Sequence, residues 1–416
     1  MSPPGNAPPA GAGAFTLVAA ATLVLAALAS FPLAGCADEA RDRIVLWHHY
    51  NGDERQALES VARDIAERKD FDIELVAIPY ENFADQITNA IPNGNGPDLF
   101  VFAHDRLGDW VEAGLVEPIE FFVDPQLAGR YAYDPLASMA YGSSLYGLPL
   151  SVKSTALFYR TDLVDEPPAT TEELVAWARA GASDDGPRYA LAYDTTDLYN
   201  HAAWLHGYGG SVFAEGELTV ASDAASRAIE FVQRLADEGI APRAVRSEMV
   251  ATLFSEGEAA MALSGPWFIG DIADGTPWDV AMLPVVAETG ERAAPFLGTE
   301  GVWMSAWSEH ESEAFAVMEA LAGDESAAVR AREARQIVPN TAVYDKEDIG
   351  DDPLLSTFRQ QLEHAVPMPG TPAMRAVWTP YARALEASIE RGGEARAALA
   401  DAERTIRGHL QHESDR

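Results

Sequence analysis

A short apolar run followed by an acid and an arginine is the feature that most constrains the fold of this chain. A Gly-Pro turn at 96–97 precedes apolar residues 99–103, and the acid and the arginine follow at 105 and 106. Continuous apolar strands of this kind are typical of parallel sheets covered on both faces. In open α/β sheets, ligands bind in the crevice beyond the carboxyl ends of the strands. The candidate crevice residues are therefore Phe102, His104, Asp105 and Arg106, whereas an ordinary strand with a capping acid and a surface arginine is the alternative.

The segments around this run alternate between strand and helix patterns. Apolar residues recur at helical spacing over 54–69 and 81–91, and strand-like stretches occur at 44–47, 71–78 and 99–103. A β-α-β-α-β alternation predicts a largely parallel sheet with right-handed crossovers. The chain has 416 residues, which is long enough for two domains. We expect the apolar segments 146–153, which contains a proline, and 297–305 to cross between those domains.

Helix signals continue in the second half of the chain. Thr170 and Glu173 have the spacing of a capping box at the start of a helix. A short apolar helix is predicted over 202–207, and an amphipathic helix over 222–238.

The N-terminal segment predicts export. Residues 1–35 carry no charged side chain, residues 15–31 are mostly apolar, and Leu33-Ala34-Gly35-Cys36 follows. A small-residue cleavage site after an apolar stretch is typical of a secretory signal. The tetrapeptide resembles a bacterial lipobox, which implies lipidation of Cys36; a permanent transmembrane anchor is the alternative. Cys36 is the only cysteine, so no disulfide can form within the chain.

Charge and residue spacing exclude several functions. The formal net charge of −36 repels phosphate backbones and anionic lipid, so we expect no nucleic-acid partner and no basic membrane patch. The three lysines, at 69, 153 and 346, do not follow a glycine-rich turn, so no Walker-type phosphate loop is present. The adjacent histidines at 48 and 49 would point to opposite faces of a strand, and those at 201 and 206 lack helical ligand spacing. We therefore expect neither a metal nor a cofactor.

Aromatic residues lie beside polar ones at four places. These places are Phe102 with Asp105 and Arg106, Asp197 with Tyr199, the tryptophan at 267, and the tryptophan at 378. Aromatic rings can cover the flat C–H faces of sugars, while carboxylates and arginine bind their hydroxyls. A sugar site is the hypothesis for the set, although core packing remains the alternative for each aromatic taken singly. A carboxylate pair for glycoside hydrolysis also stays open among the 65 acids.

Several segments together resemble one protein family. The resemblance runs in unbroken order across the mature chain through 96–108, 115–119, 148–150, 254–261, 264–267 and 368–374, and ends at Trp378. These segments resemble the bacterial maltose-binding proteins of extracellular solute-binding protein family 1, the receptors of ATP-binding-cassette sugar importers. The resemblance implies a two-lobed receptor that closes like a hinge over a disaccharide or oligosaccharide, with maltose or maltodextrin the expected ligand.

The fold implied is α/β, a two-lobed periplasmic-binding-protein fold of type II. Each lobe is expected to be a mixed, mostly parallel sheet flanked by helices, and both domains are discontinuous. The predicted boundaries are a lipoprotein signal peptide at 1–35, a lipidated tether at 36–43, a first lobe at 44–150 and 300–346, and a second lobe at 151–299 and 347–416.

The resemblance also implies ligand-binding residues. Those that match the family are Asp53, Asp105, Arg106, Asp197, Tyr199, Trp267 and Trp378. Three further candidates depart from the family. Glu54 stands where the family has a lysine, and Phe102 replaces a tryptophan. Lys153 replaces a sugar-binding glutamate, so that it pairs with Asp105 or Glu54 or binds a different substituent. The family's arginine after Trp378 is replaced by Ala382, although Arg383 is adjacent.

The implied partners are the sugar, a permease heterodimer with its cytoplasmic ATPase, and the membrane through the lipid anchor. The protein is then a monomeric, non-enzymatic receptor at the extracytoplasmic face of the membrane. A secreted glycoside hydrolase and a sugar-sensing subunit of a signalling system are the two alternatives.

Overall fold

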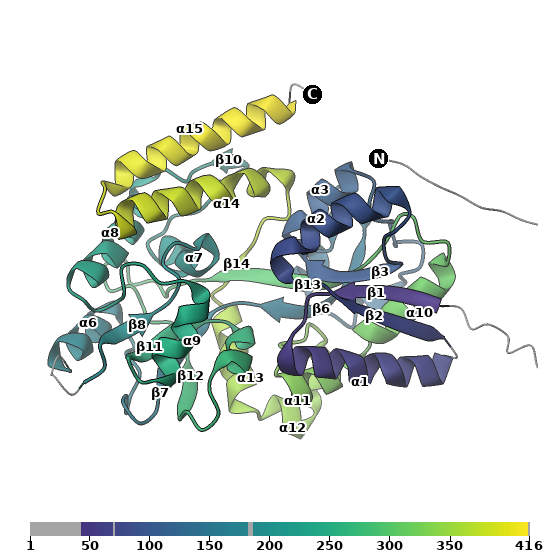
Figure 1. Cartoon of the computed structure of the whole chain (residues 1–416), viewed down its shortest axis with the longest axis horizontal. Coiled ribbons are helices and arrows are strands. Elements are labelled where there is room, and N and C mark those ends of the chain that lie inside the picture. Colours follow the sequence, from purple (N-terminus) through teal and green to yellow (C-terminus); the bar gives the residue numbers. More distant parts are fainter. Residues whose placement is uncertain (1–42, 70, 182–185, 415–416) are drawn as a thin grey trace, which may run out of the picture. The chain divides into compact units, whose positions relative to one another are not determined.

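The computed structural model describes residues 43–69, 71–181 and 186–414, which form two lobes that each contain one main β-sheet (Figure 1). The predicted signal segment and Cys36 lie outside these residues. Among the helices described, none combines the length and the apolar character needed to cross a membrane.

The sheet of the first lobe has six strands in the order β14-β13-β3-β1-β2, with β6 also paired to β13. β1 runs parallel to β2 and β3, as the alternating pattern predicts, whereas β13 runs antiparallel to β3 and β6. The strands are β1 (Arg43–His48), β2 (Asp72–Ala77), β3 (Leu99–Ala103), β6 (Gly147–Lys153), β13 (Phe296–Met304) and β14 (Val366–Pro367).

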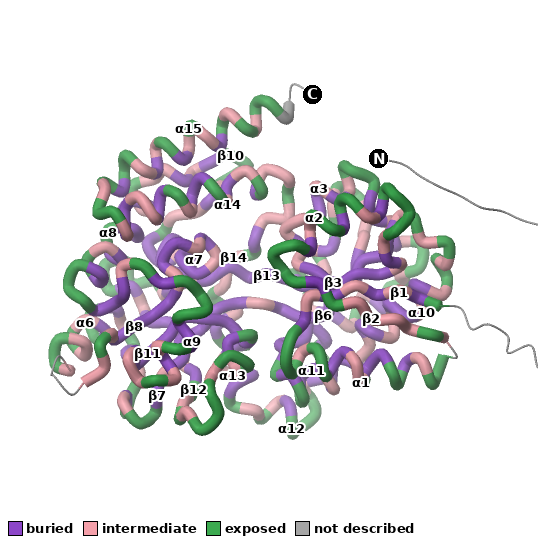
Figure 2. The backbone as a smooth tube through the Cα atoms, in the orientation of Figure 1, coloured by how far each residue is buried: buried purple, intermediate pink, exposed green. Residues whose placement is uncertain are grey.

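Strand β3 is buried on both faces, as its apolar run predicts. Leu99 and Val101 pack in a core beneath the helices α1 (Gly52–Lys69) and α10 (Glu311–Ala322). Phe100 and Phe102 point to the opposite face and pack beneath α2 (Tyr80–Ala90) and α3 (Leu107–Glu112). Figure 2 shows the neighbouring strand β13 as buried, and all of its residues are buried, whereas β2 at the edge of the sheet is intermediate or exposed. The carboxyl end of β3 is thereby held rigidly at the edge of the sheet, next to the short 3-10 turn η2 (His104–Arg106).

The sheet of the second lobe has the order β12-β7-β11-β8, and its strands are β7 (Ala156–Arg160), β8 (Tyr189–Ala192), β11 (Ala259–Ser264) and β12 (Trp278–Ala281). The two-lobed α/β class is confirmed, but the expectation of mostly parallel strands is wrong for this sheet. Only β8 and β11 are parallel, and β7 is antiparallel to both of its neighbours. β7 follows directly from β6 without a crossover helix, so the connection between lobes, rather than a βαβ unit, fixes its direction.

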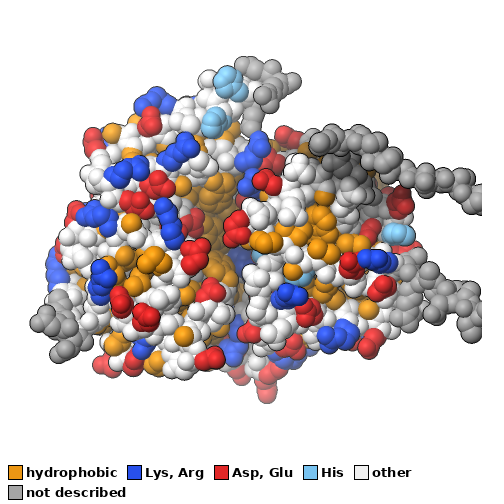
Figure 3. All heavy atoms as spheres, in the orientation of Figure 1, with side chains coloured by type: hydrophobic (Ala, Val, Ile, Leu, Met, Phe, Trp, Pro, Cys, Tyr) orange, Lys and Arg blue, Asp and Glu red, His pale blue; other side chains and the backbone are white. Residues whose placement is uncertain are grey.

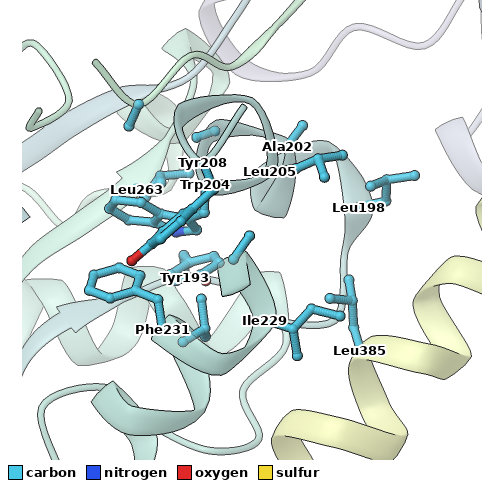
Figure 4. Close-up of a cluster of buried hydrophobic side chains, with 14 of the residues drawn as sticks. Tyr193, Leu198, Ala202, Trp204, Leu205, Tyr208, Ile229, Phe231, Leu263 and Leu385 are labelled. Atoms are coloured by element: carbon cyan, nitrogen blue, oxygen red, sulfur yellow. The ribbon is translucent and has the colours of Figure 1, made fainter. Parts of the chain in front are cut away.

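Helices cover both faces of the second sheet. One face packs against α7 (Leu198–Gly207), α8 (Asp223–Asp237), α14 (Pro372–Leu385) and α15 (Ala395–Ser414). In this core Trp204 of α7 and Tyr208, directly after α7, lie against Phe231 of α8, with ring centroids 5.1 and 5.9 Å away, and Leu385 of α14 approaches from the side (Figure 4). The other face packs against α9 (Ser247–Ser255) and α13 (Pro353–Leu362).

The remaining elements are short or lie at the edges of the lobes. They are α4 (Pro125–Ala128), α5 (Tyr133–Ala137), α6 (Thr171–Ala180), α11 (Asp324–Ala334), α12 (Glu347–Gly350), the hairpins β4 (Ala140–Tyr141) with β5 (Ser144–Leu145) and β9 (Phe213–Ala214) with β10 (Glu217–Leu218), the 3-10 turns η1 (Ile91–Asn93), η3 (Pro266–Asp271) and η4 (Thr341–Asp345), and the π-helix η5 (Glu386–Glu390).

Local capping sets two helix starts in the second lobe. Thr170 accepts a hydrogen bond from the Glu173 amide, as the capping-box spacing predicts, and α6 begins at the next residue. The helix predicted at 202–207 instead begins at Leu198, because the Asp197 carboxylate accepts the Tyr199 N–H and nucleates the first turn earlier.

Strands β6 and β13 run together from the first lobe toward the second. Their pairing shifts register beside Pro149, which leaves Leu150 as the extra residue of a bulge. The fully buried Arg330 of α11 donates to the Leu150 carbonyl at 3.1 Å, so the carbonyl at the bulge keeps a partner. Ser154 Oγ, just beyond β6, donates to the Phe296 carbonyl at 3.0 Å. The predicted lobe boundaries at 150/151 and 299/300 fall inside these two strands, so each strand contains a position where the prediction passes from one lobe to the other.

Candidate functional site

Asp105 presents an unpaired carboxylate oxygen directly after β3. Its side chain is 11% exposed, and Oδ1 has no hydrogen-bond partner among the described residues. Arg106 Nε lies 3.9 Å from Asp105 Oδ2, and Arg106 Nη1 lies 3.9 Å from Asp109 Oδ2. Burial raises the pKa of Asp105, against the opposing charge of Arg106. A hydroxyl donor at Oδ1 would relieve the cost of this buried unpaired oxygen.

His104 belongs to the scaffold rather than to the exposed site. It is 1% exposed; Nδ1 accepts the Thr299 N–H at 3.1 Å, and Nε2 lies 2.8 Å from the Met368 carbonyl, to which it donates. The Gly108 amide also donates to the Gly370 carbonyl. The turn after β3 is thus tied both to β13 and to the segment that leads into α14.

Phe102 lies inside an aromatic stack. It is 3% exposed and lies between Phe83 and Tyr80, with ring centroids 4.9 Å away on each side and interplanar angles of 9° and 23°. Tyr80 is 51% exposed. His49 meets Tyr80 and Phe102 edge-on, at 5.1 and 5.4 Å. Phe102 therefore packs beneath the Tyr80 ring, and Tyr80 is the member of the stack that is exposed.

Lys153 is the centre of a buried charge cluster at the end of β6. Its ammonium forms an ion pair with Glu54 and lies 3.3 Å from Glu300 Oε2. Glu300, which is 3% exposed on β13, also accepts hydrogen bonds from the hydroxyls of Tyr50 (3.0 Å) and Ser151 (2.9 Å). Of the two partners proposed for Lys153, the structure gives Glu54, and it adds Glu300.

Opposing charges shift the pKa values within this cluster. Burial alone would raise the pKa of Glu300, but the charge of Lys153, followed by that of His49, holds it well below its usual range. His49 Nε2 lies 2.9 Å from Glu300 Oε1. Burial would lower the pKa of Lys153, yet Glu300 and Glu54 raise it well above its usual range. Lys153 is therefore held as a cation, and its charge is already neutralised within the protein.

Asp197 and Tyr199 lie at the start of α7 in the second lobe. The carboxylate accepts the Tyr199 N–H at 3.1 Å and the Asn200 side-chain amide at 2.8 Å. Burial nevertheless raises the pKa of Asp197 to about 6. The Tyr199 hydroxyl is buried without a hydrogen-bond partner among the described residues. This pair, like Asp105, offers polar atoms that remain available to a ligand.

Trp267 and Trp378 supply aromatic surface on the second lobe. Trp267, in η3, is 37% exposed; its ring centroid lies 6.0 Å from that of Tyr199, and Lys153 Nζ lies 6.0 Å from its ring. Trp378, on α14, is partly buried and meets Phe296 edge-on at 6.3 Å. Tyr199 therefore adjoins Trp267 on one side and the Phe296 ring, at 6.2 Å, on the other.

Asp53 and Arg383, two residues considered from the sequence, are both exposed. Asp53 is exposed in the first turn of α1. Arg383, the neighbour of Ala382, is exposed and lines a hollow of about 420 Å³ between α14 and α15. Because Arg383 is five residues beyond Trp378 on a helix, it lies on a different face, so it does not take the position of the arginine expected at 382.

Groups from both lobes act on one another. Lys153 Nζ, at the end of β6, lies 3.3 Å from Glu300 of β13 and 6.0 Å from the Trp267 ring of the second lobe. Burial, followed by Tyr80, Asp197, Glu300 and Asp105, raises the pKa of Tyr199 above its usual range. Figure 3 shows a groove between the lobes, lined in large part by hydrophobic side chains. Charged and aromatic groups of both lobes therefore lie close together.

Sequence reasoning missed Tyr80, His49 and Glu300. Glu300 is the single charged residue within β13, a strand that is otherwise apolar or small, and a lone acid in such a strand was a usable signal. Tyr80 follows Pro79 at the start of α2, and no local pattern indicates that its ring covers Phe102. No group of three or more potential metal ligands occurs within the described ranges.

Two lobes joined by crossing strands, with a groove of aromatic and hydrogen-bonding groups between them, define the class of two-lobed solute-binding proteins. Sequence comparison gives the family. The family of bacterial extracellular solute-binding proteins matches residues 60–357, well over half of the chain. The chain belongs to this family.

Individual relatives are similar over most of their length. The chain is 28% identical over 343 residues to a maltotriose-binding protein of Pyrococcus abyssi, covering 81% of this chain and 75% of that protein. It is 24% identical over 413 residues to a galactooligosaccharide-binding protein of Bacillus subtilis, covering 95% and 96%. Among solved structures, a cyclo/maltodextrin-binding protein complexed with maltotetraose matches with a TM-score of 0.78 and 29% identity, over 89% of this chain and 98% of that chain.

Proposed function

We propose that this protein is the receptor of an ATP-binding-cassette importer for a maltodextrin-type oligosaccharide. The sugar would bind in the groove, contact both lobes and make the closed form dominant, because it binds that form more tightly than the open one. The closed receptor would then deliver its cargo to a permease pair coupled to a cytoplasmic ATPase. Lipidation of Cys36 would hold the receptor at the extracytoplasmic face of the membrane.

One observation carries the proposal: unpaired polar oxygens stand beside aromatic faces on both sides of the groove. Asp105 Oδ1 and the Tyr199 hydroxyl have no hydrogen-bond partners among the described residues, and Tyr80 and Trp267 are partly exposed. A small-molecule site needs this combination of apolar walls and a few placed polar groups. The maltotriose- and maltotetraose-binding relatives support a glucose polymer, whereas the galactooligosaccharide-binding relative supports testing a second class of sugar.

The remaining proposed ligand contacts follow from the same arrangement. Asp53, Glu54, Arg106, Asp197 and Trp378 are proposed to complete the sugar site. Lys153 is proposed to act by orienting Glu54 and Glu300, since both carboxylates already pair with it. Phe102 is proposed to contribute through the stack that it supports.

Isothermal titration of the purified protein tests the proposal. Maltotriose, a β-galactooligosaccharide, trehalose, sucrose and a xylo-oligosaccharide are titrated in turn, and the recovered sugar is analysed for cleavage. Micromolar or tighter binding of maltotriose, with the sugar recovered intact, is the expected result. Cleavage would favour a glycoside hydrolase, and absence of binding to every sugar by folded protein would refute the proposed ligand class.

The anchor and the transport role need separate tests. Cys36→Ser should abolish incorporation of a labelled fatty acid and release the protein from the membrane fraction. Deletion of the gene for this protein from its host should stop uptake of the sugar that the protein binds. If uptake continues and only a transcriptional response to the sugar is lost, the protein is a sensing subunit instead.

A further inference from the structure

The three rings Phe83, Phe102 and Tyr80 form a stack whose last member faces the groove. Phe83 is fully buried and Phe102 is 3% exposed, so neither ring has a free face. The planes of Phe83 and Phe102 are 9° apart and those of Phe102 and Tyr80 are 23° apart, so the Tyr80 ring stacks on the Phe102 ring and covers it. One face of Tyr80 covers Phe102, yet the residue as a whole remains 51% exposed.

His49 braces this stack from the side. Its ring meets Tyr80, Phe102 and Phe83 edge-on, with interplanar angles of 75°, 80° and 84°. Its Nε2 lies 2.9 Å from Glu300, whose carboxylate is fixed by further contacts. The Tyr80 ring is therefore held in place before any ligand arrives, which lowers the entropic cost of binding against it.

A series of contacts links Tyr80 to the second lobe. The His49 ring lies 5.1 Å from the Tyr80 ring, and His49 Nε2 lies 2.9 Å from Glu300. Lys153 Nζ lies 3.3 Å from Glu300 and 6.0 Å from the Trp267 ring. Tyr199 adjoins the partly exposed Trp267 at 6.0 Å. A flat ring on one lobe and an aromatic pair on the other therefore flank the same space, and carboxylates stand at its margin.

We propose that Tyr80 is a stacking platform for one sugar ring of the bound oligosaccharide, opposed across the groove by Tyr199 and Trp267. This inference rests on the proposed function. The apolar C–H face of a pyranose would lie on the Tyr80 ring, while its equatorial hydroxyls reach the carboxylates around it. Phe102 and Phe83 stiffen the platform, and this backing accounts for a buried phenylalanine at 102.

Variants at Tyr80 separate the ring from the cover that it gives Phe102. Tyr80→Leu keeps an apolar cover over Phe102 but removes the flat face, Tyr80→Ala removes both, and Tyr80→Phe removes only the hydroxyl. Tyr133 is the matched control, because it is also the first residue of a first-lobe helix, α5, and is 82% exposed. Circular dichroism and the unfolding midpoint of each variant establish that it is folded.

Titration with the oligosaccharide that the wild type binds gives the result. Tyr80→Ala and Tyr80→Leu should each weaken binding by about tenfold, the equivalent of one aromatic stacking contact. Tyr80→Phe should stay within about threefold, and Tyr133→Ala should match the wild type. Proton NMR should show an upfield ring-current shift of sugar C–H signals in the wild type, and Tyr80→Leu should remove it.

The outcomes distinguish the two proposals. If the wild type binds a sugar and Tyr80→Leu binds it equally well, the platform is refuted and the receptor function stands. If Tyr80→Phe loses as much affinity as Tyr80→Ala, the hydroxyl rather than the ring is responsible, which also overturns the platform. If the folded wild type binds none of the sugars, the proposed function fails and the platform fails with it.

Discussion

Glu300 should carry a large share of the stability of the region between the lobes. Glu300 is 3% exposed and has four donors or cations around it: Lys153 Nζ at 3.3 Å, His49 Nε2 at 2.9 Å, and the hydroxyls of Tyr50 and Ser151 at 3.0 and 2.9 Å. Glu300→Gln keeps the size of the side chain but removes its charge and turns one acceptor atom into a donor. The variant thus tests the charge and its contacts without opening a cavity.

The magnitude follows from these contacts. Removing one partner of a buried ion pair costs about 3–5 kcal/mol, and each buried donor left without a partner costs about 1–3 kcal/mol. Lys153 keeps Glu54 in the variant, and one carbonyl oxygen still accepts, which places the effect at the low end. We expect the free energy of unfolding to fall by about 3 kcal/mol at pH 7.

Urea denaturation of the wild type and Glu300→Gln measures this difference, with the exposed Glu333→Gln as the control. The control should change stability by no more than about 0.5 kcal/mol. A double-mutant cycle with Lys153→Met should give a coupling energy of about 1–3 kcal/mol. A loss below about 1 kcal/mol in Glu300→Gln, or a coupling energy near zero, would refute the reasoning.

The pH dependence supplies an independent check. Because the pKa of Glu300 is held below its ordinary value of 4.5, the native state favours the ionised form more than the unfolded chain does. The stability from Glu300 is therefore fully present above pH 4.5 and is lost as the pH falls toward its native pKa. The difference between the wild type and Glu300→Gln should shrink on acidification below pH 4.5, and a constant difference would contradict this.

Three further predictions concern the groove. Burial raises the pKa of Asp197 to about 6, so the native state binds this proton more tightly than the unfolded chain does. The free energy of unfolding should therefore fall as the pH rises from about 4 to about 6. Urea denaturation at each pH measures this slope, and Asp197→Asn should remove it. A Cβ on Gly265 would lie 2.1 Å from the Trp267 ring, so Gly265→Ala should displace the ring and weaken sugar binding about tenfold by calorimetry, whereas unchanged affinity would refute the role of Trp267. Arg383→Ala should leave affinity unchanged, because this exposed arginine lies against the α15 side; a clear loss would return it to the site.

The sequence predicted those parts of the fold that depend on short-range patterns. The apolar run at 99–103 forms a strand buried on both faces, because alternate residues of such a strand must each meet a packed layer. Thr170 and Glu173 start a helix through contacts made within four residues. The position of Asp105 and Arg106 after that strand also followed, since chain order alone puts them beyond its carboxyl end.

The sequence did not predict strand direction in the second sheet or the start of α7. The direction of β7 is set by β6 in the other lobe rather than by its own residues. The helix at α7 begins earlier than its apolar residues indicate, because the Asp197 cap outweighs the weak helical preference of the polar residues that follow.

The sequence by itself determined the class of fold and the local strands and helices near the groove, because alternation and capping act within a few residues along the chain. Only the tertiary structure decided which of those residues face the groove and which support it. Glu300 and Tyr50 are 250 residues apart, yet they share a hydrogen bond, and Tyr80 rather than Phe102 presents an aromatic face. Contacts between distant strands and helices depend on how whole layers pack, which no local pattern encodes.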